Sequence, residues 1–209
     1  HGMTAALLLF LAAAVVPVFF GRVRAAPTWL AAQGLALGWI NLMQHESLTW
    51  HALAAGTEVL VVRALITPGW LRSAIQRRAE PDFELMPSNL FAWSIAIALL
   101  VLAFQFGAPA MSEQHALTLG VVAATAAVAV LLLASNDAPP AQLVALLVLE
   151  NAIGLFETLL PHAWPLPVHG ALSAIYLLTI GVGAWLIGAP DGGPVAAADP
   201  RDGPHEVDR

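Results

Sequence analysis

Three ionisable residues lie in the middle of long apolar runs of this sequence. Glu58 and Arg63 share one run, and Glu150 belongs to another run further along the chain. A charge at the centre of a membrane-spanning helix costs about 2.5–3.5 kcal/mol on insertion scales, so such residues usually face protein or water and serve a function. A buried carboxyl group can hold and release a proton. The sequence therefore predicts a proton relay made of Glu58, Arg63 and Glu150.

The spacing of Glu58 and Arg63 does not favour direct pairing. Five residues correspond to about 140° around an α-helix, so we expect each side chain to meet a group on a neighbouring helix. Pro68 leaves a carbonyl one turn earlier without its usual donor, which predicts a kink in this run. The alternative to a relay is structural: polar side chains that only fix how helices pack, with Glu150 as a neutral, hydrogen-bonded acid.

A further acid, Glu157, lies seven residues after Glu150. Two helical turns take about 7.2 residues, so both acids lie on nearly the same face. Glu157 is nearer the end of its run, where a side chain that simply reaches the aqueous interface is the alternative interpretation. Gly154, between the two acids, permits close approach of another helix. Glu157 is therefore a possible additional member of the relay.

The histidines do not form a metal-binding pattern. No H-x-x-x-H or H-E-x-x-H spacing occurs, so we expect interfacial or hydrogen-bonded histidines and no metal site. The sequence also contains no nucleophile triad, phosphate loop, dinucleotide fingerprint or haem ligand pair, and no cofactor of its own is expected. Five histidines lie in or near alternate loops: His45, His51, His115, His162 and His169.

The composition indicates a membrane protein. Of 209 residues, 59% are hydrophobic and 11% are charged, whereas a soluble domain has about 25% charged residues. These values exclude a soluble globular enzyme and a disordered protein. A net charge of −6 and the absence of Lys argue against nucleic-acid binding. The absence of Cys excludes disulfides, iron–sulfur clusters and thiolate metal sites.

The predicted fold class is all-α: a polytopic integral membrane protein with seven transmembrane helices. Each apolar run is long enough to cross a bilayer as a helix. Residues 1–187 would form the transmembrane domain, and residues 188–209, rich in Gly, Pro, Ala and Asp, a disordered polar tail. The predicted runs are Met3–Gly21, Pro27–Gln44, Trp50–Leu71, Asn89–Gly107, His115–Ala134, Pro140–Leu160 and Val168–Ile187.

Arginine positions predict the orientation. Two arginines follow the first run and three follow the third, whereas the alternate loops carry no Lys or Arg. The positive-inside rule then places the N-terminus outside and the C-terminus in the cytoplasm. No basic region precedes the first run, so we interpret it as a retained helix rather than a signal peptide. The arginines are Arg22, Arg24, Arg72, Arg77 and Arg78.

Several short motifs resemble a known family. The segment Glu150-Asn151-Ala152-Ile153-Gly154-Leu155 resembles an E-x-x-I-G-L segment in the K-type subunit of respiratory complex I, which is related to the C subunit of multisubunit cation/proton antiporters. The whole chain is similar to a longer relative, the E-type membrane component of hydrogenase-4 and formate hydrogenlyase-type complexes. Arg63 to Pro68, Leu149 to Asn151 and Ser173 to Tyr176 correspond to that family's third, sixth and seventh spans.

This resemblance implies a function for the chain. It implies a non-catalytic, multi-pass subunit in a bacterial or archaeal inner membrane, packed beside antiporter-like subunits, with redox centres on other chains. Ser173 stands where the family has an acid, and Asn136 and Asp137 replace expected basic residues. Conversely, Glu58 adds a carboxylate to the third span. Asn151 and Ser173 are therefore further possible relay positions.

Three other functions remain open from the sequence. One is a subunit of a redox-free cation/proton antiporter or an inorganic-carbon-uptake complex. Another is a structural scaffold whose polar residues only specify helix packing. A stand-alone small-molecule transporter is the least favoured, because the sequence has no evident inverted repeat and no pair of broken helices.

Overall fold

The computed structural model describes residues 2–44, 50–78, 81–86, 90–105, 112–160 and 165–188. Every named element in these ranges is a helix, with an isolated antiparallel bridge between Arg22 and Glu84. The predicted all-α class is confirmed for this part of the chain. The predicted polar tail from residue 189 onward lies outside the described residues, as do His45 and His162.

The described helices correspond to the seven predicted apolar runs. The third run forms one continuous rod made of α3, a π-helical segment η2 and α4. The bounds are α1 Gly2–Phe20, a 3-10 turn η1 Val23–Ala25, α2 Ala26–Gln44, α3 Trp50–Val59, η2 Leu60–Ile66, α4 Thr67–Arg77, α5 Leu90–Gln105, α6 Glu113–Ser135, α7 Pro139–Glu157 and α8 Leu166–Gly188.

The third rod continues beyond its predicted end at Leu71. In α4 the apolar residues Leu71, Ala74 and Ile75 are buried, at the three- and four-residue spacing of an amphipathic helix. The arginines at 72 and 77 occupy the other positions. The apolar run therefore ends at Leu71, whereas the helix continues to Arg77.

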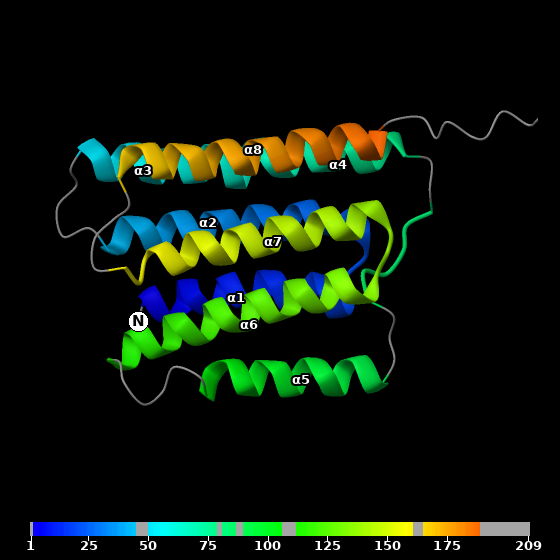
Figure 1. Cartoon of the computed structure of the whole chain (residues 1–209), viewed down its shortest axis with the longest axis horizontal. Helices are drawn as coiled ribbons and strands as arrows, with labels where there is room; N and C mark the ends of the chain where they lie inside the picture. Colours follow the sequence, from blue (N-terminus) through cyan, green and yellow to red (C-terminus); the bar gives the residue numbers. More distant parts are fainter. Residues whose placement is uncertain are drawn as a thin grey trace, which may run out of the picture.

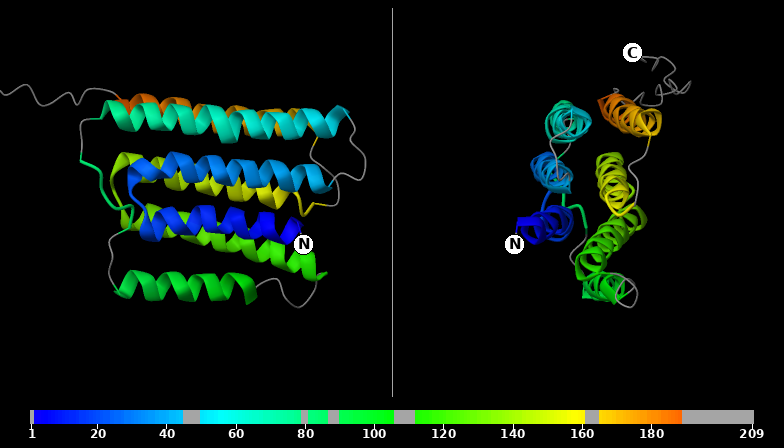
Figure 2. Two further views of the ribbon diagram at one scale, coloured as in Figure 1. Left: turned by 180° about the vertical axis from the view of Figure 1, so that it is seen from behind. Right: turned by 90° about the vertical axis from the view of Figure 1, so that its left-hand side faces the viewer.

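The helices form two layers with nearly parallel axes (Figures 1 and 2). One layer contains α1, α2 and the α3–α4 rod; the other contains α5, α6, α7 and α8. Across the layers α1 packs on α6, α2 on α7 and α4 on α8, whereas α5 lies at the edge against α6. Successive helices run antiparallel, as the short connections predict.

Several helices have the length and composition of membrane-spanning segments. Among the described residues, four helices are long and apolar enough to cross a bilayer: α1, α6, α7 and α8. The apolar helix α5 is shorter. The α3–α4 rod carries Glu58 and Arg63 and is interrupted by η2. Large apolar side chains are exposed along α5 and α8, including Phe91, Leu102, Leu178 and Trp185, as on helices that face lipid or another protein.

The two ends of the bundle differ in chemistry. At the arginine end, defined by Arg22, Arg24, Arg72, Arg77 and Arg78, the extended segment 81–86 closes over the helices. The amide of Val23 donates to the carbonyl of Phe83 (3.0 Å), Asn136 Nδ2 donates to the carbonyl of Leu85 (2.8 Å), and Leu85 is fully buried. The opposite end, where α3 and α8 begin and α7 ends, is called the acidic end here after Glu113 at the start of α6 and Glu157 at the end of α7.

Candidate functional site

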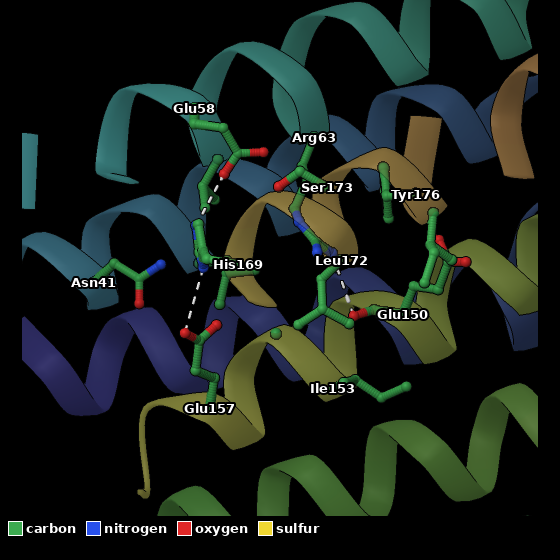
Figure 3. Close-up of a pocket in the computed structure, with 14 residues that line it drawn as sticks. Asn41, Glu58, Arg63, Glu150, Ile153, Glu157, His169, Leu172, Ser173 and Tyr176 are labelled. Carbon is green, nitrogen blue, oxygen red and sulfur yellow. Dashed lines mark hydrogen bonds and ion pairs between the residues drawn. The ribbon is translucent and has the colours of Figure 1, made fainter. Parts of the chain in front are cut away.

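A cavity of about 250 Å³ lies between the two layers in the acidic half of the bundle. Glu58, Arg63 and Glu150 all line it (Figure 3). The structure thus brings the three predicted relay residues to one place, although Glu58 and Glu150 are not bonded to each other. The remaining lining residues are Leu37, Asn41, Val59, Ile153, Gly154, Glu157, His169, Leu172, Ser173, Ile175 and Tyr176.

His169 of α8 bridges two carboxylates. Its Nε2 lies 3.2 Å from Glu58 Oε2, and its Nδ1 lies 3.3 Å from Glu157 Oε1. The three side chains are partly exposed, by 27% for Glu58, 20% for His169 and 17% for Glu157. We call these three residues the triad.

The triad is not arranged to chelate a metal. The two ring nitrogens of His169 point to different acids on different helices (Figure 3), whereas a metal site needs its donors to converge on one point. No group of three or more His, Cys, Asp or Glu that could hold a metal occurs among the described residues.

Arg63 is buried with 7% of its surface exposed. Its Nη1 donates to Asn151 Oδ1 at 2.7 Å and to the carbonyl of Glu150 at 3.2 Å, and its Cζ lies 4.2 Å from the ring centroid of Tyr176. Asn151 Nδ2 in turn donates to Gln33 Oε1 at 2.9 Å. Neutral oxygens and an aromatic face therefore hold this charge, and the expectation that Arg63 meets a group on a neighbouring helix is confirmed.

Glu150 has one satisfied and one free carboxyl oxygen. Oε1 accepts a hydrogen bond from Thr179 Oγ1 of α8 at 2.7 Å. Oε2 is buried and has no hydrogen-bond partner among the described residues. A buried oxygen without a partner is costly when the carboxylate is ionised. The carboxyl group thus has an open position that a proton or a cavity water can occupy.

The π-helical segment explains how Glu58 and Arg63 reach the same cavity. A regular α-helix would separate them by about 140°. In η2 the turn is wider, closed by bonds five residues apart, such as that from the amide of Thr67 to the carbonyl of Val62. The extra residue per turn brings positions five apart toward one side. The π segment ends at Ile66, two residues before Pro68, and the kink expected from Pro68 stays a prediction.

Two glycines bring helices close to Arg63. A Cβ on Gly34 of α2 would lie 2.8 Å from the carbonyl carbon and oxygen of Arg63. A Cβ on Gly154 of α7 would lie 3.2 Å from Leu37 and 3.5 Å from Arg63 Cζ. The close approach predicted at Gly154 is confirmed, and its neighbours are α2 and η2.

The charged groups of the interior occupy only one half of the bundle. Glu157 is the last residue of α7, and Glu150 lies about 10 Å deeper at about 1.5 Å per residue. Toward the arginine end, beyond Glu150 and Arg63, most of the described buried side chains are apolar, and the buried polar side chains Gln33, Thr67 and Thr125 are neutral. Leu30, Leu71, Val144, Leu147 and Ile180 are each at most 2% exposed there. The cavity therefore faces the acidic end and stops at an apolar layer.

Sequence reasoning missed the central position of His169. It predicted a hydrogen-bonded or interfacial histidine, and the hydrogen bonds are confirmed, but the acidic partners were not identified. The short link between α7 and α8 could have indicated this contact, because it places Glu157 at the end of α7 beside His169 in the first turn of α8. Gln33 and Thr179 also bond across helices, to Asn151 and Glu150 of α7.

Comparisons with known proteins add no relative. No protein-family model, no curated protein and no solved structure matches this chain.

Proposed function

We propose that this chain is a non-catalytic subunit of an ion-translocating membrane complex of the complex I/hydrogenase-4 superfamily. In this proposal it crosses the inner membrane of a bacterium or archaeon seven times, with its N-terminus outside, beside antiporter-like subunits. Redox chemistry takes place on other chains. The observation that carries the proposal is a cavity inside an apolar bundle that contains Glu58, Arg63 and Glu150. The motif resemblance is a separate support.

Each residue has a distinct part in the proposed proton transfer. Glu150 holds the proton at the inner end of the cavity, oriented by Thr179. Arg63 does not itself carry the transferred proton, because a guanidinium does not lose its proton in proteins. It compensates the negative charge that forms when Glu150 releases a proton. Asn151 is a positioning residue that fixes Arg63, and Ser173 lines the cavity beside Glu58.

The apolar layer beyond Glu150 has a consequence for the route. A proton that reaches Glu150 from the acidic end cannot continue along the described polar groups to the arginine end. In the proposal the chain therefore carries protons only part of the way across the bilayer, and a partner subunit accepts them near mid-depth.

The direct test is Glu150→Gln in the intact complex. Glutamine keeps the shape and the bond to Thr179 but cannot carry a proton. We expect proton translocation, followed by a pH dye in vesicles, to fall by about 100-fold or more, the size typical for loss of a positioned proton-transferring side chain. The amount of assembled complex should be unchanged. Glu113→Gln is the matched control, because Glu113 is exposed in the first turn of α6.

Two results would contradict the relay. If Glu150→Gln translocates protons at the normal rate, Glu150 carries none. If assembly and translocation fall together, the polar residues serve packing, as in the scaffold alternative.

The partners decide between the redox and redox-free forms of the proposal. We expect a tagged chain, purified gently from its native membrane, to bring antiporter-like subunits together with nickel–iron or quinone-binding subunits, identified by mass spectrometry. Antiporter-like partners alone would favour a cation/proton antiporter or an inorganic-carbon-uptake complex. A solitary chain would contradict both.

A further inference from the structure

We infer that Glu157, His169 and Glu58 form a proton-loading site, at which His169 passes a proton from water at the acidic end into the cavity. This inference rests on the proposed function and extends it. The proposed function needs protons to reach Glu150, whereas the inference names the group that admits them. It assigns His169 to proton transfer, a role that neither the sequence patterns nor the motif resemblance gives to this residue.

The donor count of the triad supports a bound proton. A neutral imidazole has one N–H donor and one acceptor nitrogen, whereas ionised carboxylates only accept hydrogen bonds. Both ring nitrogens of His169 lie 3.2–3.3 Å from carboxylate oxygens. With both acids ionised and a neutral ring, one nitrogen lone pair would face an oxygen lone pair. Both contacts become hydrogen bonds only when the triad holds one additional proton.

The position of the triad gives that proton a source and a direction. Both acids line the cavity, but Glu157 is the last residue of α7, whereas Glu58 lies eight residues after the start of α3, on the opposite side of the histidine ring. The other ionisable groups that line the cavity are Arg63 on η2, Glu150 on α7 and Tyr176 on α8; α2 contributes only Leu37 and Asn41. The triad is thus the outermost set of proton-binding groups on the route to Glu150.

The transfer balances as a simple proton relay. Water at the acidic end protonates the Glu157 carboxylate. His169 Nδ1 takes this proton while Nε2–H gives its own proton to Glu58 Oε2, and the ring changes tautomer. Rotation of the ring then turns the protonated Nδ1 toward Glu58 and the unprotonated Nε2 toward Glu157, so the next proton crosses in the same direction and no proton is lost or gained by the ring. A cavity of about 250 Å³ has room for water, whose share of the liquid is about 30 Å³ per molecule, to connect Glu58 with Glu150.

The functional test compares His169→Ala, His169→Gln and the control His115→Gln in the intact complex. His115 lies in the first turn of α6 and pairs with Ser112 on the exposed surface, away from the cavity. We expect both His169 variants to lower proton translocation by about 100-fold, as for loss of a proton-transferring side chain, and the control to leave it unchanged. Imidazole added on the side of the acidic end should restore translocation in His169→Ala, because it replaces the missing proton carrier.

The outcomes separate this inference from the proposed function. Normal translocation in His169→Gln together with loss in Glu150→Gln would overturn the loading site and leave the proposed function standing. Normal translocation in both variants would overturn both. Loss in His169→Ala without rescue by imidazole would mean that His169 only holds α3, α7 and α8 together, and would overturn its proton-carrying role.

A second measurement needs neither the complex nor a His169 variant. The ring nitrogens of 15N-labelled histidine are observed by NMR in the full chain purified into lipid nanodiscs. We expect Glu157→Gln to shift chiefly the Nδ1 resonance of His169 and Glu58→Gln chiefly its Nε2 resonance. The same two substitutions should leave His115 unchanged. If neither His169 resonance responds, the triad does not exist in solution and the inference is wrong.

Discussion

At the scale of single residues, the position of Asn151 accepts the fewest other side chains. Its side chain is fully buried, and it uses its oxygen for Arg63 and its nitrogen for Gln33. The buried guanidinium depends on this arrangement, because a buried charge is costly unless its donors are hydrogen-bonded. A side-chain amide can accept from Arg63 and donate to Gln33 at the same time, which a carboxylate or an apolar side chain of this size cannot do.

Replacing Asn151 with leucine should destabilise the bundle. The Asn151→Leu variant leaves Arg63 Nη1 with only the carbonyl of Glu150 and leaves Gln33 Oε1 without its donor. Each buried unsatisfied group costs about 1–3 kcal/mol, so we expect a clearly lower thermal midpoint in detergent. Ser94→Ala is the control, because the Ser94 hydroxyl bonds to the carbonyl of Leu90 on the exposed side of α5. An unchanged midpoint for Asn151→Leu would mean that water replaces the amide.

At the scale of elements, the π-helical segment and α2 position the site together. Gly34 lets α2 approach the backbone of Arg63, and this approach brings Gln33 within reach of Asn151 on α7. The wider turn of η2 directs Arg63 toward the same point. A π-turn inside an otherwise α-helical rod is rare and is frequently found at functional sites, in agreement with the position of η2 beside the cavity.

Gly34→Ala should separate α2 from η2. The added Cβ would lie 2.8 Å from backbone atoms of Arg63, which cannot move aside as a flexible side chain can. Overpacking of this kind costs about 1–3 kcal/mol, and we expect a lower thermal midpoint and reduced proton translocation. Gly69→Ala is the matched control on α4, since nothing lies within 4 Å of its Cβ position. Equal stability of the two variants would show that α2 and η2 are not in contact.

At the scale of the whole molecule, one end of the bundle is closed and the other opens to the cavity. The arginine end is closed by the segment 81–86 and by an apolar layer. The acidic end presents the triad and, behind it, the cavity. The proposed function requires this asymmetry, because protons would enter at the acidic end and would be kept from leaking through the arginine end.

The orientation of the molecule can be tested with single cysteines, because the sequence has no Cys. Ser112 precedes α6 at the acidic end, and Ser135 ends α6 at the arginine end; both are exposed. We expect a membrane-impermeant maleimide added to intact cells to label Ser112→Cys and not Ser135→Cys, as the positive-inside rule predicts. Labelling after lysis should reach both. The reverse pattern would invert the orientation and the direction of proton entry.

The sequence by itself determined the helical class, the positions of the seven rods and the charged residues that lie within them. Hydrophobicity is a local property, so apolar runs and the rare charges within them are visible before folding.

Only the tertiary structure decided which groups meet. Glu58 and His169 are 111 residues apart in the chain, and Asn151 and Gln33 are 118 apart. Their contacts depend on the rotation of each rod about its axis and on which rods are neighbours, and both are set by packing across the two layers. A histidine near a helix end could equally have faced water. It bridges two acids here because α3, α7 and α8 bring their ends together.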